Sequence, residues 1–220
     1  MLKKGRLSML AFLLLLSWSL LAGAQGDKPA AAPLAEKPVA PAAEAQKAPP
    51  EIPKDKQTAL GMYLTSKEAY DMWQKDQQGV KIIDCRTPEE YAFIGHAPMA
   101  VNIPSKFMAY TWDEKKKEYA MKPNPNFVKE VQKRFAKDDT ILVMCRSGQR
   151  SAPSVDLLAK AGFTKVYNIH DGFEGDKIKD PNSPNKGKRM KEGWRISGLP
   201  WTYDLDVKLI YLPKGTPKAK

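Results

Sequence analysis

The chain has 220 residues, a formal net charge of +11 and a hydrophobic share of 42%. This length allows one domain of ordinary size together with accessory segments. The two cysteines, Cys85 and Cys145, and the two histidines show no metal-ligand spacing, which argues against a structural zinc or haem site, and no cofactor is expected.

The first 24 residues have the three parts of a secretory signal peptide. Three basic residues stand among the first six, an apolar run follows at 7–21, and Ala22-Gly23-Ala24 offers a small-residue cleavage site. We therefore expect a periplasmic or otherwise exported protein that begins at or near Gln25, with no stable membrane insertion after cleavage. An uncleaved membrane anchor is the alternative, because the apolar run is nearly long enough to span a bilayer.

Charge and composition divide the rest of the chain. Cleavage after residue 24 removes three positive charges and no negative one, so the net charge falls from +11 to +8. This excess favours attraction of small anionic molecules, and nucleic-acid binding is not expected of an exported protein. Residues 25–55 are rich in Ala and Pro and predict a disordered linker. A globular domain at 56–205 and a basic tail at 206–220 complete the expected organisation.

Within the domain, strand and helix patterns alternate. Thr65 and Glu68 form a capping box before a helix at 66–77, Thr87 caps a second helix, and Asn124-Pro125 precede a third. Such alternation predicts an α/β domain with a parallel sheet covered on both faces. Strands are expected at 61–64, 80–85, 100–104, 141–144 and 165–169.

Two stretches interrupt this alternation. Residues 105–122 are polar and aromatic and include three consecutive lysines, so we expect a surface insertion there. Residues 170–193 form a second irregular stretch, rich in Gly, Lys, Pro and Asn. The segment 193–201 carries two tryptophans and is expected to close the domain by packing against it.

The most informative stretch is 141–151. Four apolar residues end at Cys145, and a short polar loop then leads into a helix expected at 152–161. Ser151 suits the N-cap of this helix, and Pro153 falls in its first turn. Ligands of parallel α/β sheets bind beyond the carboxyl ends of the strands, which is where this pattern places Cys145.

The loop favours the thiolate form of Cys145. Its backbone N–H groups, the positive end of the following helix and the charges of Arg146 and Arg150 all act in that direction. In such settings the pKa of a cysteine falls from about 8.5 to roughly 3.5–7.5. Cys145 is therefore a candidate nucleophile, and a buried core cysteine is the alternative interpretation.

The length of the loop narrows its chemistry. Arg150 closes a Cys-x4-Arg loop, one residue shorter than the Cys-x5-Arg loop of a cysteine phosphatase, which weakens a phosphatase or arsenate reductase as an alternative. A smaller ring of N–H groups better fits the single terminal sulfur of a persulfide. The segment Cys-Arg-Ser-Gly-Gln-Arg-Ser at 145–151 resembles the active-site loop of rhodanese-type sulfurtransferases.

The resemblance runs from about Leu64 to Trp201. Residues 84–91, 95–104 and 193–200 resemble the family's Asp-x-Arg-x-Pro-x-Glu-Tyr segment, its Gly-His-Ile-Pro-Gly-Ala-x-Asn-Ile-Pro segment and its closing Trp with Gly-x-Pro. The resemblance implies one rhodanese-like domain, with a five-stranded parallel α/β sheet and helices on both faces.

It also implies an activity. Cys145 would be the catalytic nucleophile of a sulfurtransferase, taking sulfur from a small anionic donor such as thiosulfate and passing it, as a persulfide, to a thiol or protein acceptor. A persulfide or anion carrier with little turnover of its own is the alternative. The longer insertion at 174–192 departs from the family's pattern and suggests an unusual acceptor. The candidate substrate-binding residues are Arg146, Ser147, Gly148, Gln149 and Arg150.

Other polar residues have structural interpretations. Asp84 and Arg86 are expected to support the fold by buried pairing, with Glu90 a candidate partner for Arg86. Cys85 is expected to face the core and not to form a disulfide with Cys145 in the resting protein, although an oxidising compartment permits one.

Overall fold

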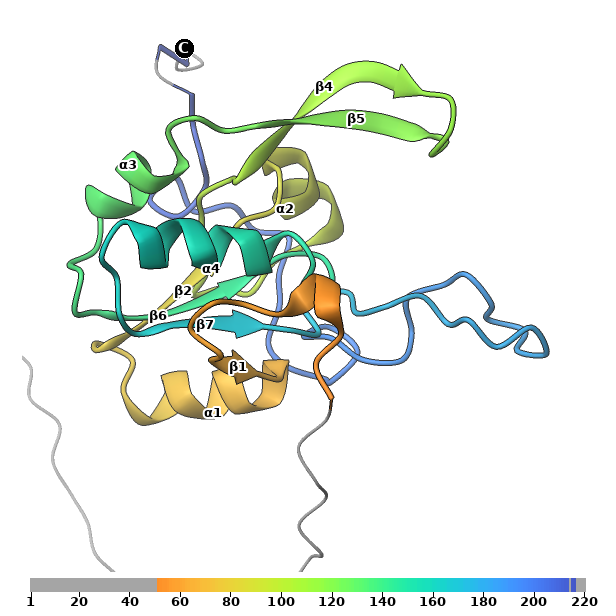
Figure 1. Ribbon diagram of the computed structural model, residues 1–220, viewed down its shortest axis with the longest axis horizontal. Helices are drawn as coiled ribbons and strands as arrows, with labels where there is room; N and C mark the ends of the chain where they lie inside the picture. Colours follow the sequence, from red (N-terminus) through yellow and green to blue (C-terminus); the bar gives the residue numbers. More distant parts are fainter. Residues whose placement is uncertain (1–50, 214, 217–220) are drawn as a thin grey trace, which may run out of the picture. The chain divides into compact units, whose positions relative to one another are not determined.

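The computed structural model describes residues 51–213 and 215–216 (Figure 1). The signal peptide expected at 1–24 and most of the linker expected at 25–55 lie outside the described residues. A single turn of 3-10 helix, η1 (Lys54–Lys56), precedes the sheet. The Lys56 side chain is buried and bonds Asp176 at 2.7 Å, so this turn is packed onto the domain.

The centre of the domain is a five-stranded sheet in the order β1-β7-β6-β2-β3, in which every pairing is parallel. The expected five-stranded parallel sheet is confirmed. β6 and β2 are parallel neighbours in this sheet. Cys145 and Cys85, which directly follow these strands, therefore lie side by side at the carboxyl ends of the strands. The strands are β1 (Tyr63–Leu64), β2 (Val80–Asp84), β3 (Val101–Asn102), β6 (Thr140–Met144) and β7 (Val166–Ile169).

Helices cover both faces of this sheet, with α1 on one side and α3 and α4 on the other (Figure 1). The capping boxes at Thr65–Glu68 and Thr87–Glu90 both form and fix where α1 and α2 begin. Apolar residues alternate between the faces: Ile83 and Val143 pack under α4, whereas Ile82 and Leu142 pack on the side of α1. The helices are α1 (Ser66–Lys75), α2 (Pro88–Ile94), α3 (Phe127–Gln132) and α4 (Ser151–Lys160).

The insertion at 105–122 is an antiparallel hairpin of β4 (Lys106–Asp113) and β5 (Glu118–Pro123), which projects from the domain (Figure 1). Its sequence is rich in aromatic residues, which favour strands, and the lysine run forms its turn. A surface position was expected for this segment, but its strands were not predicted from the sequence.

Residues near the C-terminal end of the described chain contact the edge of the sheet and the hairpin. The N–H of Asn102 in β3 donates to the carbonyl of Leu209 at 2.8 Å, and Tyr211 packs on Phe107. The first residues of the expected basic tail therefore lie along the edge strand.

Among the described residues, no helix is both long enough and apolar enough to cross a membrane.

The expectation that Ser151 caps the helix after the Cys145 loop is wrong. α4 begins at Ser151 itself, and Arg150 takes the N-cap position. The Ser151 side chain is fully buried, with its Oγ 2.7 Å from Oδ1 of Asn168 and 3.5 Å from Sγ of Cys145. Its hydroxyl thus faces the interior of the loop instead of the helix N-terminus.

Candidate active site

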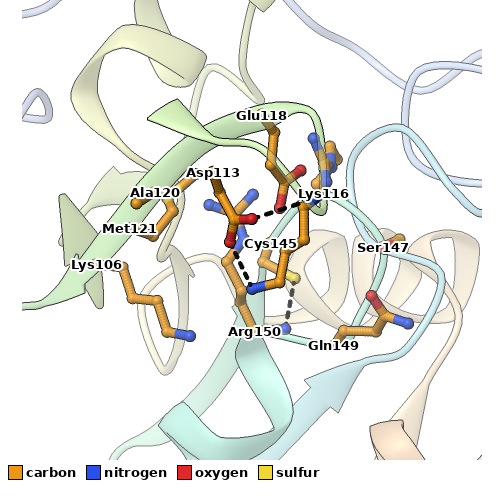
Figure 2. Close-up of a pocket in the computed structure, with 11 residues that line it drawn as sticks. Lys106, Asp113, Lys116, Glu118, Ala120, Met121, Cys145, Ser147, Gln149 and Arg150 are labelled. Atoms are coloured by element: carbon orange, nitrogen blue, oxygen red, sulfur yellow. Dashed lines mark hydrogen bonds and ion pairs between the residues drawn. The ribbon is translucent and has the colours of Figure 1, made fainter. Parts of the chain in front are cut away.

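The loop between β6 and α4 curls around Cys145. The backbone N–H of Arg150 donates to Sγ of Cys145 at 3.3 Å, a contact drawn in Figure 2. From outside the loop, the N–H of Phe173 donates to the carbonyl of Cys145 at 2.8 Å. Gly148 adopts a φ of +89°, which allows the tight turn. Of the ring of inward N–H groups expected from the sequence, the N–H of Arg150 and the backbone of Ser147 contact Cys145 in the described structure.

The environment of Cys145 stabilises its thiolate. Burial opposes ionisation, but a hydrogen bond from the Cys85 thiol and the charge of Arg150 outweigh it, with help from Ser151 and the Ser147 backbone. Together they hold the pKa of Cys145 well below its usual range. Burial and the neighbouring Cys145 raise the pKa of Cys85. The negative charge of this pair therefore belongs on Cys145.

The guanidinium of Arg150 is held by Glu90. The two side chains form a bidentate ion pair of 2.6 and 2.7 Å that is mostly buried, with 14% and 11% of each side chain exposed. The expectation that Glu90 pairs with Arg86 is wrong, because the first turn of α2 directs Glu90 toward the Cys145 loop. Arg150 therefore acts on Cys145 from a fixed position.

Asp84 and Arg86 form a separate, fully buried ion pair at the end of β2. Arg86 donates to the Asp84 carboxylate and to the carbonyl of Gly95, and its guanidinium lies 4.1 Å from the centre of the Phe173 ring. These contacts link β2, the turn after α2 and the segment that supports the Cys145 loop. Their position suits the structural role expected from the sequence.

A cavity of about 290 Å³ opens above Cys145, between the loop and the hairpin (Figure 2). The hairpin contributes two lysines and two carboxylates, and Asp113 lies 3.6 Å from Lys116. These residues were not predicted from the sequence, although the charged run in the insertion was the available signal. The hairpin residues that line the cavity are Lys106, Asp113, Lys116, Glu118, Ala120 and Met121.

The predicted loop residues divide between two cavities. Arg146, Ser147, Gln149 and Arg150 line the first cavity, whereas Gly148 shapes the turn. Ser147 and Gln149 also border a second cavity of about 320 Å³, and Gln149 donates to Asp55 at 2.5 Å.

The second cavity is lined partly by the insertion at 174–192. This segment brings Arg189 near Arg146, and burial together with the charge of Arg146 lowers the pKa of Arg189. Nε of Arg146 is buried and has no hydrogen-bond partner among the described residues. Within residues 51–213 and 215–216, no group of three or more His, Cys, Asp or Glu side chains is arranged to hold a metal ion.

Comparison with known proteins agrees with this geometry. The sequence model of the rhodanese-like domain family matches residues 65–179, which are 115 of the 220 residues. The chain belongs to the rhodanese-like family. The expected resemblance is thereby confirmed, and the fold is a single rhodanese-like α/β domain.

Individual relatives place the rhodanese-like domain among plant and bacterial proteins. Senescence-associated protein DIN1 of Raphanus sativus is 37% identical over 97 residues, which cover 44% of this chain and 48% of the relative. Thiosulfate sulfurtransferase 16 of Arabidopsis thaliana is 38% identical over 95 residues, covering 43% and 72%. The chain spans about half the length of the first curated relatives that it matches.

A solved structure has the same fold. The crystal structure of Rv0390 from M. tuberculosis superposes with a TM-score of 0.51 at 27% sequence identity. The superposition covers 67% of this chain and the whole length of the M. tuberculosis protein.

Gly148 gives a first test of the rhodanese loop. A Cβ at this position would lie 2.2 Å from the carbonyl oxygen of His170, so we expect Gly148→Ala to displace the loop. Strain of this kind costs on the order of 1–3 kcal/mol, and the rate at which Cys145 is alkylated should fall with it. Chemical unfolding and intact-mass measurements would show both effects.

Gly198→Ala is the matched control. Gly198 also has a positive φ, of +72°, but a Cβ there meets nothing within 4 Å. Gly198→Ala should show only the backbone cost and keep the wild-type rate of Cys145 alkylation. Equal behaviour of the two variants would contradict the close approach of Gly148 to His170.

Proposed function

We propose that this protein is an exported sulfurtransferase that moves a sulfane sulfur from a thiosulfate-like donor to a thiophilic acceptor through a persulfide on Cys145. Family membership and the likeness to a plant thiosulfate sulfurtransferase support sulfur transfer as the general class of chemistry. The observation that carries the finer proposal is the low-pKa Cys145, which lines a cavity together with cationic side chains.

The proposed reaction has two steps, in which Cys145 first accepts a sulfur atom and then passes it on. The Cys145 thiolate attacks the outer sulfur of thiosulfate, the sulfur–sulfur bond of the donor breaks, and sulfite leaves with the electron pair. Backbone N–H groups of the loop, such as that of Arg150, hold the charge of the resulting persulfide. An acceptor thiol then attacks the outer sulfur and regenerates the thiolate.

The charges around the cavity suit an anionic donor. Lys106 and Lys116 reach the cavity from the hairpin, and Arg146 reaches it from the loop. Both terminal nitrogens of Arg150 already donate to Glu90, so we assign donor binding mainly to these three residues and assign to the charge of Arg150 the stabilisation of the thiolate. This division refines the role expected for Arg150 from sequence.

The thiosulfate–cyanide assay tests this function. A sulfurtransferase forms thiocyanate over many turnovers. In each turnover the persulfide intermediate makes the intact protein one sulfur atom heavier. A carrier module would gain the sulfur atom once and turn over slowly. Absence of both the persulfide and thiocyanate would reject both.

Lys106 should influence donor binding. We expect Lys106→Ala to raise KM for thiosulfate roughly 1.4- to fivefold with little change in kcat, since one partly exposed charge contributes about 0.2–1 kcal/mol. Lys115→Ala is the matched control, because Lys115 is an exposed lysine of the same hairpin that does not line the cavity among the described residues. Equal KM values for the two variants would argue against donor binding by Lys106.

Export is a separate part of the proposal and is supported by the residue pattern at 1–24. We expect the mature protein to begin at or near Gln25 and to be recovered outside the cytoplasm. N-terminal sequencing of protein from separated cell fractions measures this. A cytoplasmic protein that retains Met1 would reject the export proposal while leaving the sulfur chemistry untouched.

A further inference from the structure

Cys85 lies directly beside Cys145 on the neighbouring strand. β2 and β6 are paired in parallel with Asp84 opposite Met144, and the N–H of Cys85 donates to the carbonyl of Met144 at 2.8 Å. The pairing therefore extends one step further, to Cys85 opposite Cys145. Paired strands lie about 4.8 Å apart, which is within the range of Cα separations that a disulfide spans.

The two sulfur atoms are on the same face of the sheet. Residues 83 and 143 pack on the face covered by α4, and so do Cys85 and Cys145, because side chains alternate along a strand. The Ser154 hydroxyl of α4 lies 3.8 Å from Sγ of Cys85. Both cysteines are free thiols in the described structure.

The two thiols differ in what they face. Cys145 lines the cavity under the hairpin, whereas Cys85 is fully buried in the core. A sulfur atom added to Cys145 finds room toward the cavity, because the core is close-packed. Cys85 lies on the core side of Cys145, so an outer sulfur directed into the cavity leaves the inner sulfur facing Cys85, where thiol–disulfide exchange can occur.

We propose that Cys85 is an internal acceptor, which discharges the Cys145 persulfide as sulfide and closes a Cys85–Cys145 disulfide when no external thiol is present. This inference rests on the persulfide of the proposed function. The sulfur of Cys85 attacks the inner sulfur of Cys145, a bond forms between them, and the bond to the outer sulfur breaks. The outer sulfur leaves with the electron pair and takes up the proton of Cys85. Both cysteines are oxidised and the sulfane sulfur is reduced to sulfide, so the step needs no further oxidant.

The surroundings make this step slower than transfer to an external thiol. The attacking species in such exchange is the thiolate, and burial keeps Cys85 protonated. An acceptor that enters the cavity meets the exposed outer sulfur first. The internal step thus becomes visible when acceptors are scarce, and it leaves the resting protein without a disulfide until a sulfur donor has acted.

The test loads the mature protein with sulfur and withholds any acceptor. Thiosulfate and, separately, inorganic polysulfide serve as donors, followed by intact mass, sulfide release and non-reducing peptide mapping. We expect a species one sulfur atom heavier, then one that is two hydrogen atoms lighter than the starting protein, with one equivalent of sulfide. The chain has only two cysteines, so a monomer of that mass can contain only the Cys85–Cys145 bond.

Cys85→Ser and Cys85→Ala provide the comparison. Both should still gain the sulfur atom but lose it at least about tenfold more slowly than the wild type, without stoichiometric sulfide. A wild-type persulfide that decays no faster than in these variants, or that decays without an 85–145 bridge, overturns the inference. Closure of the bridge after polysulfide but not after thiosulfate would support the inference and reject thiosulfate as donor. Circular dichroism of both variants confirms that they fold.

Discussion

Replacing Cys145 with serine is expected to abolish transfer of sulfur from thiosulfate to cyanide, leaving only the rate measured without protein. A serine hydroxyl fits the loop but remains protonated at neutral pH, and its oxygen does not carry a sulfane sulfur. The contacts that lower the pKa of Cys145 would remain around the serine, so the shape of the site is kept while the nucleophile is removed. Thiocyanate formation and intact mass after thiosulfate measure the two consequences.

The control for this variant is the other thiol. Cys85→Ser replaces the cysteine outside the loop and keeps Cys145. This variant should still become one sulfur atom heavier after treatment with thiosulfate. Unfolding curves of both variants separate a chemical defect from a folding defect. Full activity in Cys145→Ser would end the proposal of a sulfurtransferase.

The strands and helices that organise the sheet could be predicted because their signals are local. Capping boxes at Thr65 and Thr87 mark helix starts through side chains only three residues apart, and both form as expected. The run at 141–144 is apolar throughout because both faces of β6 are covered. The hairpin at 105–122 was missed because its aromatic and charged residues lack the alternation of a half-buried strand.

The errors at the candidate site come from contacts between distant segments. Ser151 has the residue type and position of an N-cap, but its hydroxyl faces Asn168 of β7, which only the folded sheet brings near. By residue type, Glu90 could form an ion pair with either Arg86 or Arg150. The direction of α2 places it beside Arg150. The hairpin's position over Cys145 likewise depends on the tertiary fold, which has no signature in the local sequence.

Arg150→Ala is expected to weaken both the fold and the reaction. Removal of the guanidinium leaves the Glu90 carboxylate mostly buried and without its ion-pair partner, which costs about 3 kcal/mol of unfolding free energy, the low end for breaking a buried pair because both side chains keep some exposure. The guanidinium also stabilises the Cys145 thiolate by its charge, and a neighbouring opposite charge shifts a pKa by about 1–3 units, so kcat/KM for thiosulfate should fall roughly tenfold or more. Chemical unfolding and thiosulfate–cyanide kinetics measure these effects.

The same variant should raise the pKa of Cys145. Arg150 is one of the groups that lower this pKa. Its removal also leaves the negative charge of Glu90 unpaired near Cys145, and a like charge disfavours the thiolate. Since only the thiolate reacts, alkylation of Cys145 at neutral pH should slow, and the rate should recover as the pH is raised through the new pKa. Alkylation rates across a pH series, with the labelled peptide identified by mass, give the midpoint.

The double variant Glu90→Gln with Arg150→Ala separates the two roles of the ion pair. It removes the unpaired carboxylate, so most of the lost stability should return. It does not restore the positive charge beside the thiolate, so the pKa of Cys145 should stay above its wild-type position and kcat/KM should remain low. Recovery of activity together with stability would show that Arg150 serves the fold alone. An unchanged alkylation midpoint in Arg150→Ala would likewise remove its assigned effect on the thiolate.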